Sequence, residues 1–201
     1  MTAPTIVEAT RRDAHPAAAL IGTAFHDLDV AAWLVRDPIE RARVLYANIR
    51  IFVEHAFDYG AVHFTEDRAG VAVWFRRDRP LPEIGDYERR LWLACGRYTN
   101  RFQALDTAFA EHHPDAAHHH LAFLAVHPDH QGHGIGTALL DRYHARLDRA
   151  DMPAYLEASS PRSRALYARH GYLDRGTPIT LPDNGPHLWP MWRPPTSGNE
   201  R

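Results

Sequence analysis

The stretch that decides the fold is HPDHQGHGIGTALL, residues 127–140. Three of its glycines stand at alternate positions, Gly132, Gly134 and Gly136, and a helix-forming run follows directly. Glycine in or beside a helix costs roughly 0.5–1 kcal/mol relative to alanine. A chain that accepts this cost three times in five residues indicates that something approaches the backbone closely here.

The surroundings of this loop predict what approaches it. The apolar run LAFLAV, residues 121–126, is typical of a buried central strand, and a helix is expected to run from the loop to about Ala150. Free backbone N–H groups and the positive end of the helix dipole attract anions at such a position. Alternate glycines let a bulky anion touch the backbone with no Cβ between them. The predicted ligand of the loop is a diphosphate group.

The spacing of the glycines restricts which diphosphate-containing ligand fits the loop. A Walker loop needs a Gly-Lys-Ser/Thr ending, and the chain contains no lysine. The dinucleotide pattern G-x-G-x-x-G does not fit G-x-G-x-G, although Glu157 follows Gly136 by 21 residues, about where a ribose-binding acid would lie. A nicotinamide or flavin enzyme, and a tight turn with only a structural role, therefore stay open as alternatives.

Composition places this loop in one globular domain. The chain has 201 residues, of which 45% are hydrophobic and 24% charged. Its net charge of −2 argues against a nucleic-acid binder, and its single cysteine excludes an internal disulfide. No signal peptide or membrane span is recognisable, so a cytoplasmic protein is expected. We expect one domain over residues 1–193 and a disordered tail over residues 194–201.

Hydrophobic periodicity predicts a mixed α/β order of elements. Helices are expected over a first apolar stripe from Ala17 to Leu28, from Pro38 to before Gly60, within residues 83–113, from the glycine loop to Ala150, and from Pro161 to before Gly171. Strands are expected at 4–9, 61–66, 70–75, 118–126 and 154–158, with two more within 172–193.

At these residues the chain resembles a known family. Gln131-x-x-Gly134-x-Gly136 is similar to the coenzyme A loop of the GNAT N-acetyltransferase superfamily, and SRALYARHGY, residues 163–172, resembles that superfamily's tyrosine motif. GVAVW, VHPDHQGHGIG, PAYLEASSPR and YARHGY look more narrowly like the puromycin N-acetyltransferase branch. The resemblance implies a mixed, mostly antiparallel sheet of about seven strands flanked by helices, with a helical insertion between the third and fourth strands.

The resemblance also implies acetyl-CoA as cosubstrate. In such enzymes the fourth strand splays from the fifth and its exposed backbone holds the pantetheine arm, while the loop amides hold the diphosphate. The implied cofactor residues are Leu124, Ala125, Val126, Gln131, Gly132, His133, Gly134, Ile135, Gly136, Thr137, Ser160 and Tyr167.

Tyr167 matches the family's partner for the departing thiolate. The implied chemistry is direct attack by an amine on the thioester carbonyl in a ternary complex. A thiol has a pKa of about 8.5 and a phenol of about 10, so full proton transfer would be uphill by roughly 2 kcal/mol. A hydrogen bond to the sulfur is the less costly way to fill this role. The alternative is a tyrosine that only packs its helix.

Two residues are candidates for the general base, His120 and Glu157. His120 stands four residues before Leu124, where histone-acetylating relatives place a carboxylate, and Glu157 lies toward the end of the strand AYLEA. A lysine-like amine must lose its proton at a cost of about 4.6 kcal/mol at pH 7, whereas an α-amino-like group needs little help. Both candidates stay open.

The histidine run AHHHL predicts no metal site. In a strand, His118 and His120 share one face while His119 points away. Two histidines without a nearby third ligand are weak support, because a catalytic zinc usually has three protein ligands.

The acceptor pocket is expected between the link at residues 27–37, the insertion and the tail, with Trp33, Trp74 and Tyr87 as flat apolar walls. Ordinary core packing is the alternative for each of the three. We expect a monomer or homodimer that acetylates a primary amine of a small molecule, in self-resistance or detoxification. The alternatives are a protein or peptide acetyltransferase, which predicts an open groove, and a non-catalytic acyl-CoA-binding module.

Overall fold

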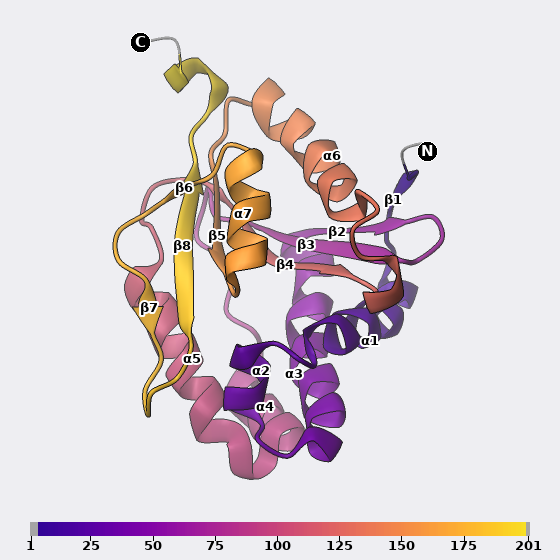
Figure 1. The fold of residues 1–201 in the computed structure, drawn as a ribbon, viewed down its shortest axis with the longest axis vertical. Coiled ribbons are helices and arrows are strands. Elements are labelled where there is room, and N and C mark those ends of the chain that lie inside the picture. The colour runs from indigo at the N-terminus through magenta and orange to yellow at the C-terminus, as the bar shows by residue number, and fades with distance from the viewer. Residues whose placement is uncertain (1–3, 200–201) are drawn as a thin grey trace.

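A computed structural model describes residues 4–199 of the chain, and its centre is an eight-stranded sheet in the order β1-β2-β3-β4-β5-β8-β6, with β7 paired to β8 (Figure 1). Among the strands of residues 4–199, only β4 and β5 pair in parallel. The strands are β1 (Ile6–Glu8), β2 (Gly60–Thr65), β3 (Gly70–Arg76), β4 (His119–Val126), β5 (Ala154–Ala158), β6 (Leu173–Asp174), β7 (Ile179–Thr180) and β8 (His187–Arg193).

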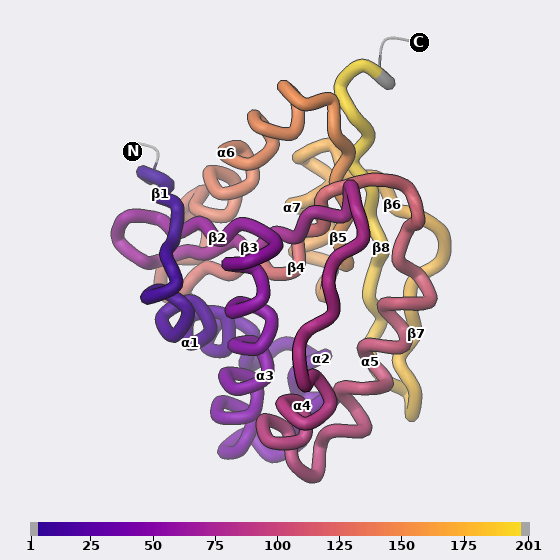
Figure 2. The backbone as a smooth tube through the Cα atoms, turned by 180° about the vertical axis from the view of Figure 1, so that it is seen from behind, coloured from indigo at the N-terminus to yellow at the C-terminus, as the bar shows by residue number. Residues whose placement is uncertain are grey.

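Helices cover both faces of this sheet. They are α1 (Ala14–Phe25), α2 (Asp29–Leu34), α3 (Pro38–Tyr59), α4 (Tyr87–Cys95), α5 (Thr99–His112), α6 (Ile135–Arg149) and α7 (Pro161–Arg169). In both views the insertion α4–α5 lies with α2 and α3 at one end of the molecule, away from α6 (Figures 1 and 2).

The alternation of side chains along β3 shows why the protein has two cores. Val71, Val73 and Phe75 pack with the helices α1 and α3, whereas Ala72 and Trp74 pack with α6. A strand buried on both faces reads as an unbroken apolar run, as GVAVWF does.

The expected mixed fold is confirmed, with differences at its edges. The segment 172–193 forms three strands rather than two, because the short strands β6 and β7, which flank Gly176 with its φ of +74°, both pair with β8. The link between the first two long helices contains α2, whose six residues are too few for a periodic stripe.

The C-terminal tail is described only in part. Part of the tail expected to be disordered, residues 200–201, lies outside the described residues. The rest of it includes a 3-10 helix, Thr196–Asn199, tied down by a 3.0 Å hydrogen bond from the Ser197 amide to Asp151. Within residues 4–199, no helix is long and apolar enough to cross a membrane.

Candidate active site

The central feature of the site is the separation of β4 from β5. β4 pairs with β3 along its whole length, but with β5 only at His119↔Ala154 and His120↔Tyr155. From Leu121 to Val126, the β5-facing edge of β4 is therefore left without a strand partner. Six residues at about 3.3 Å each give this edge a length of about 20 Å.

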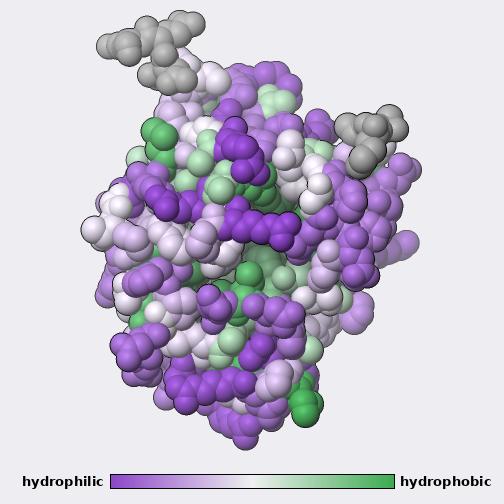
Figure 3. All heavy atoms as spheres, viewed as in Figure 1, coloured by the Kyte–Doolittle hydropathy of each residue, from purple (hydrophilic) through white to green (hydrophobic). Residues whose placement is uncertain are grey.

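The gap lies on one face of the molecule. Leu124 and Val126 are half-buried and pack toward the core of α6 and α7, whereas Ala125 is buried in the opposite core. Figure 3, drawn in the view of Figure 1, shows this face hollowed near its centre with hydrophobic side chains deep in the hollow. Figure 1 places β4 and the beginnings of α6 and α7 in that region.

The glycine loop lies at the far end of this edge, where α6 begins. Gly132 and Gly134 have φ values of +84° and +80°, in the left-handed region that other residues rarely adopt. A Cβ on Gly136 would instead lie 3.4 Å from Leu166 of α7 and 3.8 Å from Leu124, which is ordinary contact. The backbone conformation therefore explains two of the three glycines, a reason that the sequence pattern alone did not provide.

The same loop presents backbone donors. Of the described residues, none accepts a hydrogen bond from the amides of Gly132 to Thr137, and Ala138 is the first to bond back, to the Gly134 carbonyl at 3.0 Å. Gly132, His133 and Gly134 are exposed, and Ile135 is buried beneath them. This is the donor arrangement that binds anions at a helix N-terminus.

A polar contact joins the glycine loop to α7. The Gln131 side chain donates to the Val126 carbonyl at 3.3 Å and accepts from Arg162 at 3.2 Å. Arg162 is a cation at the first turn of α7 beside the loop amides. Sequence reasoning missed it, because only the fold brings α7 next to the glycine loop.

Ser160 lies at the start of α7 and caps it. Its side chain accepts from the Ser163 amide at 3.1 Å, and Pro161 follows at the first helical position. The hydroxyl therefore already has a structural role. Thr137, on α6, is joined to His170 at the end of α7 by a 3.3 Å hydrogen bond. This last contact joins α6 to the end of α7, the two helices that flank the gap.

Tyr167 is buried on α7, in the core that α6 shares with β5. Only 7% of its surface is exposed, and its ring meets that of Tyr172 edge to face at 5.8 Å. Burial raises the pKa of the Tyr167 hydroxyl above its usual value of 10. Of the described residues, none forms a hydrogen bond with this hydroxyl. Tyr167 therefore stays protonated, and its O–H group is available as a hydrogen-bond donor.

The two candidate bases form one pair. The Nε2 of His120 on β4 lies 2.9 Å from Oε2 of Glu157 on β5, and their side chains are only 13% and 5% exposed. The pair bridges the two strands where they begin to part. The sequence offered these residues as alternatives, and the fold joins them.

Further histidines surround this pair. His113, which follows α5, lies edge to face with His120 at 5.0 Å and contacts His118 through a 3.1 Å separation of their Nε2 atoms. Burial lowers the pKa of His113 to about 2 and that of His118 to about 4, so both are neutral at pH 7. His119 points to the other side, where it is hydrogen-bonded to Tyr143. The expected division of the three consecutive histidines is therefore seen.

Trp33 lies where the acceptor pocket was expected. Its indole nitrogen donates to the Pro182 carbonyl at 3.0 Å, and the Arg101 guanidinium lies over its ring at 4.8 Å. Arg101 also pairs with Asp183 at 3.5 Å. The link (α2), the insertion (α5) and the tail therefore meet around one indole ring.

Trp74 does not line such a pocket, and this expectation is corrected. Trp74 is fully buried and stacks on Tyr143 of α6 at 4.2 Å, so the alternative of ordinary core packing holds for it. Tyr87 is half-buried and packs on Phe52, and its hydroxyl donates to Asp106 at 2.6 Å within the insertion. Its role as a pocket wall stays a prediction.

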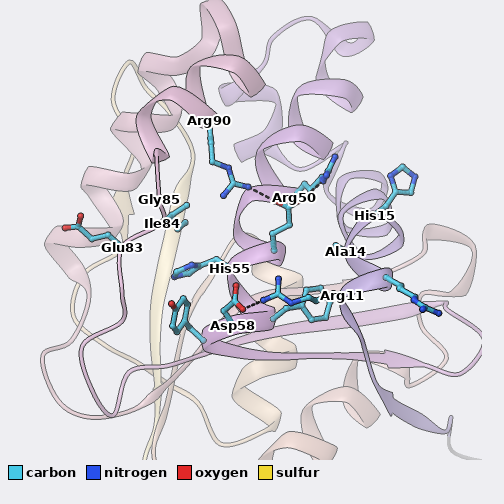
Figure 4. A pocket seen from close by; sticks show the side chains of 14 residues that line it. Arg11, Ala14, His15, Arg50, His55, Asp58, Glu83, Ile84, Gly85 and Arg90 are labelled. Carbon is cyan, nitrogen blue, oxygen red and sulfur yellow. Dashed lines mark hydrogen bonds and ion pairs between the residues drawn. The ribbon is translucent and has the colours of Figure 1, made fainter.

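A cavity of about 810 Å³ lies elsewhere in the molecule (Figure 4). It is lined by residues of the N-terminal segment 11–15, α3 and residues 83–90, and by none from β4, β5, α6 or α7. Three of the four arginines that line it are paired: Arg50 and Arg90 both contact Glu54, and Arg11 contacts Asp58. It is therefore separate from the gap.

Residues 91–173, which include β4, the glycine loop, α6, β5 and α7, match the family model for an acetyltransferase (GNAT) domain. The whole fold agrees with solved GNAT acetyltransferases. The matched domain and the 27%-identical acetyltransferase support an acetyl-CoA-dependent N-acetyltransferase.

Three solved structures are similar to this chain over nearly its whole length. Histone acetyltransferase HPA2 and related acetyltransferase from Corynebacterium glutamicum is 27% identical, with 97% of this chain and 98% of that chain covered and a TM-score of 0.69. Arylalkylamine N-acetyltransferase 2 from Aedes aegypti is 12% identical, with 94% and 98% covered and a TM-score of 0.59. The NatC complex bound to Gag peptide and CoA is 14% identical, with 97% and 100% covered and a TM-score of 0.53.

Proposed function

We propose that the protein acetylates a primary amine of a small molecule, such as an antibiotic or related metabolite, by direct attack on acetyl-CoA in a ternary complex. The observation that carries this proposal is the His120–Glu157 pair, which bridges β4 and β5 at the closed end of the gap. Sequence likeness to the puromycin N-acetyltransferase branch is the reason for the antibiotic class. We also propose a cytoplasmic location.

The gap suits the shape of the cosubstrate. The diphosphate would bind the free amides between Gly132 and Thr137, with Arg162 close enough to add its charge. The pantetheine arm would then lie along the edge from Val126 to Leu121 and bond to backbone groups as an added strand does. That placement brings the thioester to the His120 end.

His120 then accepts the amine proton. Its Nε2–H donates to the Glu157 carboxylate, so in the neutral imidazole the lone pair is on Nδ1. The amine nitrogen attacks the thioester carbon, the C–S bond breaks, and the amine proton passes to Nδ1. Glu157 holds the ring and stabilises the imidazolium that forms. Tyr167 donates to the departing sulfur.

The contacts of Trp33 favour an enclosed acceptor pocket over an open groove. Trp33 and Arg101 join α2 and α5 to the turn at Pro182 and Asp183. A peptide laid across this side would have to separate those segments, whereas a small amine would not. This observation supports a small acceptor over a protein or peptide one.

A thiol-release assay with acetyl-CoA tests the proposal. The acceptor panel contains aminonucleosides, polyamines, amino acids and peptides. We expect release with at least one small amine and none above background with peptides. Release with peptides alone would show a peptide acetyltransferase, and coenzyme binding without release would show a non-catalytic acyl-CoA-binding module.

A further inference from the structure

We propose that the closed end of the gap also binds a divalent transition-metal ion of the Zn²⁺ class, through His113, His120 and Glu157. One ring nitrogen of each histidine and one carboxylate oxygen of Glu157 all lie within 4.8 Å of one another. Three protein ligands of this kind, with a fourth position left open, are the usual set of a reactive zinc site.

The fold assembles a ligand set that is not visible along the chain. Strand pairing brings Glu157 beside His120, and the end of α5 brings His113. The sequence predicted no metal because His118 and His120 had no third ligand nearby. In the structure His118 takes a supporting position instead: it contacts His113 and donates from its Nδ1 to the Ala116 carbonyl at 2.7 Å.

A second observation independently points to a ligand at this place. The other oxygen of Glu157, Oε1, is fully buried and has no hydrogen-bond partner of good geometry among the described residues; the nearby Tyr155 hydroxyl donates to the His112 carbonyl instead, at 3.5 Å. A buried acceptor left without a partner costs about 1–3 kcal/mol. An ion bound between Glu157 and the two imidazoles would remove that cost.

Distances and charge favour a transition metal. Zinc–ligand bonds of about 2.0–2.2 Å place tetrahedral ligands roughly 3.4 Å apart, so the ligand atoms need to shift by no more than about 1.5 Å. The buried Arg77 guanidinium lies within electrostatic range of Glu157. Its positive charge disfavours Mg²⁺ or Ca²⁺, which are held by oxygen and charge, more than ions that bind imidazole nitrogen.

The consequence for catalysis rests on the proposed function, although the metal site itself does not. The ion would bind His120 and Glu157, the two residues that otherwise form the base and hold it in place. Zn²⁺ is therefore expected to inhibit acetyl transfer.

Calorimetric titration of the full-length, chelator-treated protein with ZnCl₂ alone tests the site without any need for turnover. We expect one tight site in the native protein, little heat with MgCl₂, and affinity lowered by more than about 100-fold in His113→Gln. Glu157→Gln should lose the site as well, while Asp141→Asn, at a second group of possible ligands near His144 and His170, is the matched control and should keep it.

The outcomes separate the two proposals. Binding that is equal in the native protein and in a folded His113→Gln variant, or no binding at all, overturns the metal site. In a thiol-release assay Zn²⁺ should inhibit the native protein but not His113→Gln, each compared with its own rate without metal. A protein that binds Zn²⁺ as expected but acetylates nothing would contradict the proposed function alone.

Discussion

At the scale of single residues, His120 and Glu157 show what the sequence can and cannot provide. Each residue type is a reasonable base, and each stands near a strand that the glycine loop identifies. Their 2.9 Å contact depends on the parallel pairing of β4 with β5, which no local pattern encodes. The sequence therefore named both residues but could not tell that they act together.

Substitutions in the pair should be strongly non-additive. His120→Gln is expected to lower kcat by about 10²-fold or more, because the proton acceptor is lost. Glu157→Gln should lower it as well, and the double variant should be little worse than His120→Gln. Steady-state thiol release measures all three. Fully multiplicative losses would show that the residues act separately.

Tyr167→Phe should slow turnover and spare binding. Burial keeps the hydroxyl protonated, so it can donate to the thiolate that leaves in the reaction but adds little to binding of the intact thioester. Loss of one hydrogen bond to a charged group, worth about 1.5–3 kcal/mol, predicts a fall in kcat of roughly 10- to 100-fold. The Kd for CoA, measured by calorimetry, should change less than about twofold. Unchanged turnover would leave Tyr167 with a packing role only.

At the scale of elements, substitutions in the glycine loop can distinguish a glycine that the backbone conformation requires from one that ligand access requires. Gly134→Ala places a Cβ at a φ of +80°, which costs roughly 1–2 kcal/mol, and should lower both Tm and acetyl-CoA affinity. Gly136→Ala meets only ordinary contacts in helical backbone, so Tm should hold. Thermal melts with and without CoA measure both effects. A Gly136→Ala protein with native CoA affinity would show that no ligand approaches that Cα.

The buried histidines of β4 and α6 make stability depend on pH. Burial lowers the pKa of His119 to about 4 and that of His144 to about 3, whereas both titrate near 6.5 in the unfolded chain. Above pH 6.5 both histidines are largely neutral in the folded and in the unfolded chain, so the free energy of unfolding is not lowered. Below pH 6.5 the unfolded chain gains protons first, so each such histidine lowers the free energy of unfolding by roughly 2 kcal/mol at pH 5.

Urea denaturation at pH 7.5 and pH 5 measures this loss. His119→Gln should reduce the difference between the two pH values by roughly 2 kcal/mol, whatever it does to stability at pH 7.5. The exposed His133 offers a control, since His133→Gln should leave the difference unchanged. An equal pH dependence in the native protein and in His119→Gln would contradict the neutral, buried state of His119.

At the scale of the whole molecule, periodicity predicted the layers better than the site. The long helix Pro38–Tyr59 and the strand Ala154–Ala158 agree with their expected bounds because each carries a strong local signal, a proline start or a bounded apolar run. Trp74 was misplaced because composition cannot show which side of a two-faced strand lines a cavity. The positions of Arg162 and His113 beside the site follow from tertiary contacts alone.

In the proposed function, the unpaired edge of β4 has one central role, which is to receive the arm of acetyl-CoA. A crystal structure of the protein with bound CoA tests it most directly. We predict the diphosphate on the amides between Gly132 and Thr137, and the pantetheine hydrogen-bonded to backbone groups of Leu124 and Val126 between β4 and β5. Coenzyme bound anywhere else, or a gap that stays closed to it at saturating concentration, would contradict the account.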